Sequence, residues 1–170
     1  MTAPVVRVEN LRKHYGAQQA LRGLDFAVRP GEIFGLIGPD GAGKTTLMRI
    51  MAALMAPTEG SIRTAGCDVV ADAERVHAVT GYMPQRFGLY EDLSVLENLL
   101  LYADLKSLSP QNRDEIFARL LHFTRLEPFV KRRAGRLSGG MKQKLGLACA
   151  LMAEPEILLL DEPSVGVDPI

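Results

Sequence analysis

The sequence has few of the residues that hold disulfide-rich or metal-rich proteins together. Its 170 residues include two cysteines, three histidines and no tryptophan. Cys67 and Cys149 lie far apart, and the histidines share no ligand-like spacing, so neither a disulfide framework nor a metal site is indicated. This usage favours a reducing compartment. Cys149 lies in an apolar helical stretch, and we expect it to be a small core residue.

The sequence also lacks an excess of either charge and any long hydrophobic run. Its 20 lysines and arginines balance 20 aspartates and glutamates. A balanced chain gives no support to broad attraction to nucleic acid, so we expect no nucleic-acid partner. No apolar run approaches the roughly 18 residues of a membrane span, and the first residues lack the apolar core of a secretion signal. We expect a protein that would serve a membrane from the aqueous side.

Two kinds of strand are predicted from the apolar pattern. Residues 5–9 and 24–28 alternate apolar and polar side chains, as half-buried strands do, and residues 61–64 form another strand after a turn. The short apolar runs 32–37 and 157–160 are typical of strands buried on both faces of a sheet.

Helices are expected between these strands. Ser94 and Glu97 match a capping box, and Pro110 fits the first position of a helix over residues 111–124. We expect Ile116, Leu120 and Phe123 to share one face of that helix. The other predicted helices span residues 45–55 and 139–152. A strand, a glycine-rich loop and a helix, followed later by an apolar strand, predict a parallel α/β sheet.

The glycine-rich loop lies between the apolar run 32–37 and the first helix. Its sequence is Gly38-Pro39-Asp40-Gly41-Ala42-Gly43-Lys44-Thr45, which fits the phosphate-binding pattern G-x-x-x-x-G-K-[ST]. Glycines let backbone N–H groups converge on phosphate oxygens, and the helix N-terminus adds partial positive charge. We expect Lys44 to reach the β- and γ-phosphates and the Thr45 hydroxyl to ligate Mg²⁺. A chance glycine-rich turn is the alternative, but its place between a strand and a helix argues against it.

Two carboxylates follow the apolar run 157–160. A carboxylate at the carboxyl end of a parallel strand lies beside the ligand crevice. Asp161 can hold the hydration shell of Mg²⁺, and Glu162 can accept a proton from the attacking water. A turn acid after a core strand is the alternative, which the phosphate loop makes less favourable.

A second anion-binding pattern lies at residues 137–143. Ser138, Gly139 and Gly140 place a hydroxyl and two glycine amides at a helix start. One nucleotide cannot easily occupy two phosphate cradles in one chain, so this pattern suggests contact with the γ-phosphate held by another subunit. In isolation, an ordinary serine cap with a Gly-Gly hinge would explain it.

With these three motifs in this order, the sequence resembles an ATP-binding cassette (ABC) domain over its whole length. The resemblance implies an α/β fold: a P-loop NTPase (RecA-like) core, an antiparallel β subdomain and an inserted α-helical subdomain. It implies one incomplete domain, in which residues 1–85 and 154–170 form the nucleotide-binding core and residues 86–153 the helical subdomain with the signature motif.

The resemblance also implies further site residues. Tyr15 matches the aromatic residue that stacks on adenine, although a packed surface tyrosine is the alternative. Gln85 matches a glutamine that senses Mg²⁺ and water, and therefore joins Thr45 and Asp161 as a magnesium residue and Glu162 and Lys44 as a catalytic residue. Thr46 completes the nucleotide-binding loop. Asp168 matches the acidic end of a loop that crosses the dimer interface.

Within the family, residues 82–98 and 139–143 are similar to bacterial multidrug-export ATPase subunits. The implied function is to bind and hydrolyse ATP, with Mg²⁺, between two such domains arranged head to tail. The implied partner is a transmembrane permease subunit, contacted through residues 86–105. The chain would then lie in the cytoplasm, on the inner face of the cell membrane.

The sequence departs from the family pattern in two places. Asp40 stands where asparagine is usual, and two like charges roughly 4 Å apart cost about 4 kcal/mol at an effective dielectric near 20. We therefore expect its side chain to point to solvent. Family members also continue past the position of Asp168, so we interpret the chain as truncated. We expect the strand at 32–37 to be poorly supported and hydrolysis by this chain alone to be weak or absent.

Two other functions stay open from the sequence. A soluble cassette ATPase acting on DNA or the ribosome would be expected to carry long coiled-coil insertions or a basic domain, and neither is present. An inactive nucleotide-binding module disagrees with the presence of Lys44, Gln85, Asp161 and Glu162, although the missing tail favours it for this chain alone.

Overall fold

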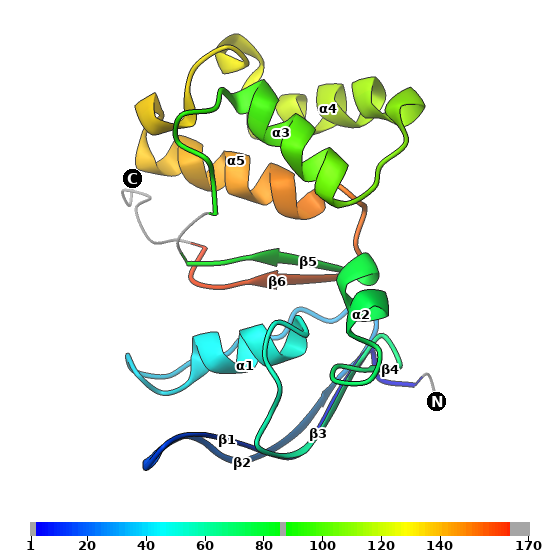
Figure 1. The fold of residues 1–170 in the computed structure, drawn as a ribbon, viewed down its shortest axis with the longest axis vertical. Helices are drawn as coiled ribbons and strands as arrows, with labels where there is room; N and C mark the ends of the chain where they lie inside the picture. Colours follow the sequence, from blue (N-terminus) through cyan, green and yellow to red (C-terminus); the bar gives the residue numbers. More distant parts are fainter. Residues whose placement is uncertain (1–2, 86–87, 164–170) are drawn as a thin grey trace. The chain divides into compact units, whose positions relative to one another are not determined.

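The computed structural model describes residues 3–85 and 88–163, and Figure 1 shows its helices and strands. The chain divides into two compact units, residues 1–80 and 81–170. The first unit holds the phosphate loop, and the second holds the carboxylate pair and the signature motif. The predicted division into a core (1–85 and 154–170) and a helical subdomain (86–153) stays a prediction.

An antiparallel sheet forms most of the first unit. Strands β1 (Val6–Tyr15), β2 (Gln18–Val28), β3 (Glu59–Thr64) and β4 (Cys67–Asp68) lie in the order β2-β1-β3-β4. Val6 of β1 pairs with Val28 on one side and Thr64 on the other. The three strands predicted here are confirmed: β1 starts one residue later than predicted and runs on to Tyr15, and β2 and β3 start earlier than predicted.

The core of this unit lies between the sheet and helix α1 (Lys44–Met51). Leu47, Ile50 and Met51 are the buried residues of α1. Ile50 and Met51 follow Leu47 by three and four residues and therefore lie on the same side of the helix, as packing against a sheet requires. The hydroxyl of Thr64, which is fully buried, donates to the Met51 carbonyl at 3.0 Å and ties β3 to the end of α1. Helix α1 ends earlier than predicted, and Ala53 just beyond it has a positive φ of 55°.

The predicted strand at residues 32–37 is wrong. The described strands form two sheets, and neither contains residues 32–39. Ile33 and Ile37 are fully exposed, at 100% each. The Phe34 ring stacks on the Phe26 ring with centroids 5.1 Å apart. An apolar run forms a buried strand only where neighbouring strands pair with it, and the described residues provide none.

In the second unit, two parallel strands lie next to three helices (Figure 1). Strands β5 (Thr80–Met83) and β6 (Ile157–Leu160) pair side by side. The parallel pairing predicted from the sequence is therefore confirmed for these strands. Burial on both faces of β6 is not, because Leu158 is 37% exposed whereas Leu159 is 5% exposed. Successive side chains of a strand point to opposite faces, and the face that carries Leu158 is less covered.

Helices α3 (Val95–Leu105), α4 (Pro110–Thr124) and α5 (Gly139–Leu151) share one apolar core. Val95, Leu99, Leu120 and Leu145 are among its buried members. The capping box of α3 and the proline at the start of α4 are confirmed. Of the three residues expected to share one face of α4, Leu120 is buried and Phe123 is 65% exposed, and the buried residues of the helix also include Phe117 and Leu121.

The remaining short elements connect these parts. They are α2 (Ala73–Val79) in the first unit and the 3₁₀ turns η1 (Glu127–Phe129) and η2 (Ala134–Arg136) in the second. Cys149 is a core residue as expected, and burial raises the pKa of its thiol to about 12. Among the described helices, none combines the length and apolar character needed to cross a bilayer.

Candidate functional site

The phosphate loop bends sharply where it enters α1. Gly43 has a φ of 90° and precedes the first helical residue. A Cβ at this position would lie 2.6 Å from the Ala20 carbonyl oxygen of β2 and 2.8 Å from a Leu21 methyl carbon. Both the left-handed backbone and the contact with β2 therefore require glycine. This glycine brings the loop directly against the strand.

Lys44 closes the loop from within. Its ammonium group donates hydrogen bonds to the carbonyl oxygens of Gly38 at 2.8 Å and Pro39 at 3.0 Å. The Ala42 N–H donates to the Pro39 oxygen at 3.2 Å, which completes a turn inside the loop. The charge of Lys44 is thus held at the centre of the loop by the loop's own backbone.

Asp40 points away from the loop, as expected. Its side chain is fully exposed, and its carboxylate lies 4.0 Å from the Lys44 nitrogen. A solvated carboxylate at this distance is screened by water and salt. Its charge is therefore largely solvated.

The first turn of α1 suits an anion. It begins at Lys44, includes Thr45 and Thr46, and contains no acidic residue. Gly43 has no side chain that could cap the helix amides. The partial positive charge of the helix N-terminus is therefore not neutralised by a neighbouring carboxylate within the turn. Glycine backbone, lysine and helix end together form a cradle whose chemistry fits a phosphate group.

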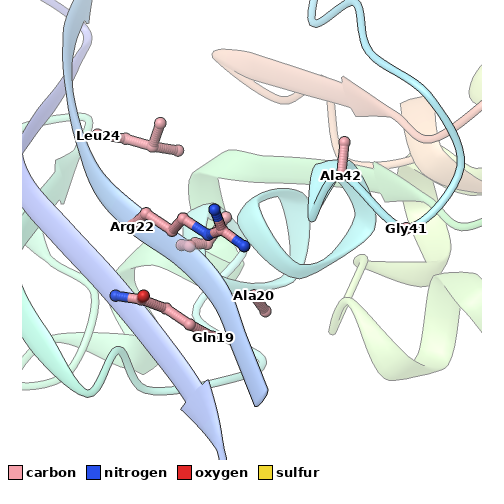
Figure 2. Close-up of a pocket in the computed structure, with 7 residues that line it drawn as sticks. Gln19, Ala20, Arg22, Leu24, Gly41 and Ala42 are labelled. Carbon is pink, nitrogen blue, oxygen red and sulfur yellow. The ribbon is translucent and has the colours of Figure 1, made fainter.

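A pocket of about 330 Å³ lies between β2 and the phosphate loop. Figure 2 shows the side chains around it, with Arg22 extending from β2 toward the side on which Ala42 lies. The lining combines apolar, amide and cationic groups. Its residues are Gln19, Ala20, Leu21, Arg22, Leu24, Gly41 and Ala42.

Tyr15 lies at the end of β1, where it pairs with Gln18 of β2. Its hydroxyl contacts the sulfur of Met55 at 2.9 Å, and the Lys13 ammonium lies 5.5 Å from the ring centroid. The side chain is 46% exposed. The ring is therefore held in place while much of its surface stays accessible, although Tyr15 is not part of the lining of the pocket in Figure 2.

The carboxyl ends of β5 and β6 bring three predicted residues together in the second unit. The Asp161 N–H donates to the Met83 carbonyl at 2.9 Å, so the two strand ends are adjacent. Gln85 follows β5 by two residues and is exposed. Asp161 is buried, and the Tyr82 hydroxyl lies 3.4 Å from its Oδ2. Oxygen-bearing side chains thus gather where parallel strands end.

Glu162 has an unusual backbone conformation. Its φ is 53°, in the left-handed region that favours glycine. This conformation costs a non-glycine residue about 1–2 kcal/mol, and such strain is concentrated at functional sites. The turn places a half-buried glutamate immediately after the buried Asp161.

The signature motif forms the start of α5. The Met141 N–H donates to the Ser138 hydroxyl oxygen at 3.3 Å, so Ser138 is the N-cap of the helix. Ser138 and Gly139 are nevertheless exposed, and a Cβ at Gly140 would meet no atom within 4 Å. The serine cap weighed as an alternative is therefore present, and the helix start is also accessible.

Sequence reasoning missed the residues that organise the segment before α3. Asn98 is fully buried, and its amide nitrogen donates to the carbonyls of Tyr90 at 3.0 Å and Ser94 at 2.9 Å. Its Oδ1 accepts from the Tyr90 N–H at 2.9 Å. The Lys142 ammonium of α5 pairs with Glu91 at 2.6 Å. An asparagine in a helix made mostly of apolar residues was the signal that could have identified this role.

The predicted site residues fall into the two units described above. Lys44, Thr45 and Thr46 lie in the first, and Gln85, Asp161 and Glu162 lie in the second. Asp168 lies outside the described residues. Within residues 3–85 and 88–163, no three His, Cys, Asp or Glu side chains form a group that could hold a metal ion by themselves. A magnesium ion here would need oxygen from hydroxyl, amide or phosphate groups as well.

The chain shows clear similarity to known proteins. Residues 21–165 match the family model described as "ABC transporter". The chain is 56% identical over 172 aligned residues to the "Probable multidrug ABC transporter ATP-binding protein YbhF" of Escherichia coli K12, with 100% of this chain and 30% of that protein covered. It is 40% identical to the "Nod factor export ATP-binding protein I" of Paraburkholderia xenovorans LB400, covering 99% of this chain and 56% of that protein.

Solved structures agree with the sequence matches. A dimeric ATP-binding cassette in a post-hydrolysis state, bound to ADP and Pi, superposes with a TM-score of 0.84 and 29% identity. The match covers 96% of this chain and 76% of that one. The predicted α/β fold of the P-loop NTPase class is therefore confirmed. Given the family match, the shared fold and the motifs, the chain belongs to the ABC transporter family, as an ATP-binding domain similar to those of export systems.

Proposed function

We propose that this chain binds ATP in the cradle formed by residues 38–46 and hydrolyses it in partnership with a second ABC domain. The observation that carries the proposal is the entry of the phosphate loop into α1. Gly43 there allows no side chain, and Lys44 is held across the loop by two backbone carbonyls. This arrangement directs a lysine and a helix N-terminus to one place, as phosphate binding requires.

Each loop residue has a role in this proposal. Lys44 pairs with the β- and γ-phosphates, and the backbone amides from Gly41 to Thr46 surround the phosphate chain. Tyr15, whose ring is held by Lys13 and Met55, stacks on the adenine. Gly38, Pro39 and Ala42 shape the loop, and Asp40 stays in solvent.

The magnesium ion is proposed to be held by oxygen atoms of Thr45, Gln85 and Asp161. Hydroxyl, amide and carboxylate oxygens suit this hard cation, which keeps several waters when bound beside phosphates. Bound there, the ion would neutralise charge that develops on the transferred phosphoryl group. Asp161 is already buried at the carboxyl end of β6, with its backbone fixed by Met83.

Glu162 is proposed as the general base for the attacking water. It follows Asp161 directly and is held in a left-handed turn. A carboxylate at this point can accept the proton that the water loses when its oxygen attacks the γ-phosphorus and the bond to the β–γ bridging oxygen breaks. Gln85, at the end of the adjacent strand, is proposed to orient the same water.

The second domain is proposed to contribute its signature motif. Ser138 and Gly139 are exposed at the start of α5, and the space beside Gly140 is open. These groups would contact the γ-phosphate bound by a partner arranged head to tail, together with Asp168. The dimeric state of the similar solved cassette supports this arrangement.

The whole protein is proposed to drive multidrug-type export from the cytoplasmic face of a membrane, through a transmembrane permease partner. The names of the two similar export proteins support this proposal. The segment around Tyr90 and Leu96, which Asn98 organises from α3, is the proposed contact for the permease. Tyr90 is 55% exposed and Leu96 is 37% exposed.

Single-turnover hydrolysis tests the catalytic part of the proposal. Protein in excess over radiolabelled ATP and Mg²⁺ is compared with the Glu162→Gln variant, and product is measured over time. We expect slow product formation by the unmodified chain, because residues 32–39 leading into the loop are not paired in a sheet. Removing a general base lowers the rate by about 10²–10⁴-fold, while ATP binding is retained. Equal rates for the two proteins would exclude Glu162 as the base.

A further inference from the structure

Arg22 is a charged residue beside the phosphate loop and is not one of the proposed nucleotide-binding residues. It is exposed, and it lines the pocket that β2 forms with Gly41 and Ala42. Ala20 and Leu24, which lie on either side of Arg22 along β2, line the same pocket. In Figure 2 the guanidinium of Arg22 lies on the side of β2 that carries the phosphate loop.

The charge of Arg22 has no counterpart within the described part of the chain. No ion pair or side-chain hydrogen bond joins it to any of residues 3–85 or 88–163. Its direct cross-strand neighbour on β1 is another arginine, Arg12. Like charges placed directly opposite each other in an antiparallel pair are destabilising.

The two arginines differ in how their charges are balanced. The Arg12 Nε lies 3.7 Å from a carboxylate oxygen of Glu59 and donates to Asn10 Oδ1 at 3.3 Å. Arg22 instead faces a pocket one wall of which is the phosphate loop. An anion in this pocket would give Arg22 the counter-charge that Glu59 gives Arg12.

We propose that Arg22 is a second cationic contact for the phosphate chain of the bound nucleotide, opposite Gly41 and Ala42 and additional to Lys44. The proposal rests on the proposed ATP-binding function. Arg22 binds the negatively charged phosphate chain, because its planar guanidinium donates hydrogen bonds to phosphate oxygens. Ala20, Leu21 and Leu24 give the pocket an apolar lining as well. The alternative is therefore that the pocket holds the sugar or base of the nucleotide instead of its phosphates.

Binding of ATP and of inorganic tripolyphosphate to the full chain separates these possibilities, because tripolyphosphate has no sugar or base. Affinities are measured by calorimetry, in the presence of Mg²⁺, for the unmodified chain and for Arg22→Gln, Arg22→Lys and Arg12→Gln. Loss of one charge-assisted contact predicts that Arg22→Gln weakens both ligands by about tenfold. Arg22→Lys keeps the charge and restores most of the affinity. Arg12→Gln is the matched control and changes either affinity by less than about twofold.

The thermal midpoint of the ligand-free protein shows whether a weaker affinity reflects a folding defect. Removing one of two opposed arginines is expected to leave the midpoint of Arg22→Gln unchanged or raised. Undiminished binding by Arg22→Gln would overturn the assignment. It would also be overturned if ATP binding weakened while tripolyphosphate binding did not, because the pocket would then hold the sugar or base.

Failure of the inference is distinct from failure of the proposed function. If Lys44→Ala loses both ligands while Arg22→Gln keeps them, only the role of Arg22 is wrong. If Lys44→Ala keeps both ligands, the phosphate loop is not the nucleotide site, and both proposals fail together.

Discussion

At the scale of single residues, Gly43 is the position where the phosphate loop tolerates least change. We predict that Gly43→Ala lowers the free energy of unfolding by more than about 2 kcal/mol. The left-handed backbone alone costs an alanine about 1–2 kcal/mol, and its Cβ would also lie 2.6 Å from the Ala20 oxygen. Urea denaturation measures the loss.

Gly16→Ala is the matched control for this prediction. Gly16 also has a positive φ, of 57°, but a Cβ there would meet no atom within 4 Å. Its substitution should therefore cost only the conformational part, about 1–2 kcal/mol. Equal losses in the two variants would show that contact between the loop and β2 does not constrain Gly43.

Asp40 lies in the same loop as Gly43, but we expect this position to tolerate substitution. We predict that Asp40→Asn changes the dissociation constant for ATP by less than about threefold, because exposed charges are screened by water and salt. The side chain is fully exposed and 4.0 Å from the Lys44 nitrogen. Titration calorimetry of the two proteins measures the effect. A tenfold gain in affinity would mean that the carboxylate turns toward the nucleotide.

At this scale the sequence predicted the kinds of residue well and their surroundings less well. The G-x-x-x-x-G-K-[ST] pattern identified the loop, because its glycines, lysine and threonine each have a separate role in binding phosphate and Mg²⁺. It did not reveal the contact of Gly43 with β2, because Ala20 and Leu21 come from a segment more than twenty residues earlier. Arg22 was missed for the same reason: only the pairing of β1 with β2 places it opposite Arg12.

At the scale of elements, the capping box at the start of α3 contains a titratable carboxylate, that of Glu97. The Ser94 N–H donates to Glu97 at 2.7 Å, and the Glu97 N–H donates to the Ser94 hydroxyl at 3.2 Å. Hydrogen bonds from the Ser94 side chain and backbone lower the pKa of Glu97 below its usual value of 4.5. The folded state therefore favours the carboxylate more than the unfolded state does.

The sign of the resulting pH effect follows from this lowered pKa. The stabilisation is complete above the unfolded pKa and is lost as the pH falls through the lower, folded pKa. We predict that the thermal midpoint falls as the pH is lowered from about 5 to below about 4, and that Glu97→Gln falls less over this range. Circular dichroism at each pH measures the midpoints. Identical pH profiles for the two proteins would show that Glu97 does not contribute to the pH dependence of stability.

Elements that depend on local chemistry were predicted more accurately than those that depend on distant partners. The capping box of α3 and the proline at the start of α4 lie within a few residues of each helix, and both were confirmed. The strand expected at 32–37 requires pairing partners from elsewhere in the chain, and it is not formed. The helical period places Phe123 on one face with Ile116 and Leu120, but a period alone does not fix which face is buried, and Phe123 is 65% exposed.

At the scale of the whole molecule, the chain is only part of the length of its curated relatives. It spans 30% of the first and 56% of the second relative described above. Its phosphate loop and its carboxylate pair belong to separate compact units, residues 1–80 and 81–170. The sequence showed the order of the motifs but not this division, because contact density is a property of the folded chain.

The proposed roles of all the other site residues depend on capture of the nucleotide's phosphates by the cradle around Lys44. Titration of Mg²⁺ and ATP into the full chain and its Lys44→Ala variant tests it directly, with Lys131→Ala, an exposed lysine of the second unit, as the control. Loss of a charged contact predicts that Lys44→Ala binds ATP at least about tenfold more weakly and that Lys131→Ala binds it normally. Equal affinity of Lys44→Ala and the unmodified chain would show that this cradle does not bind the phosphates of the nucleotide.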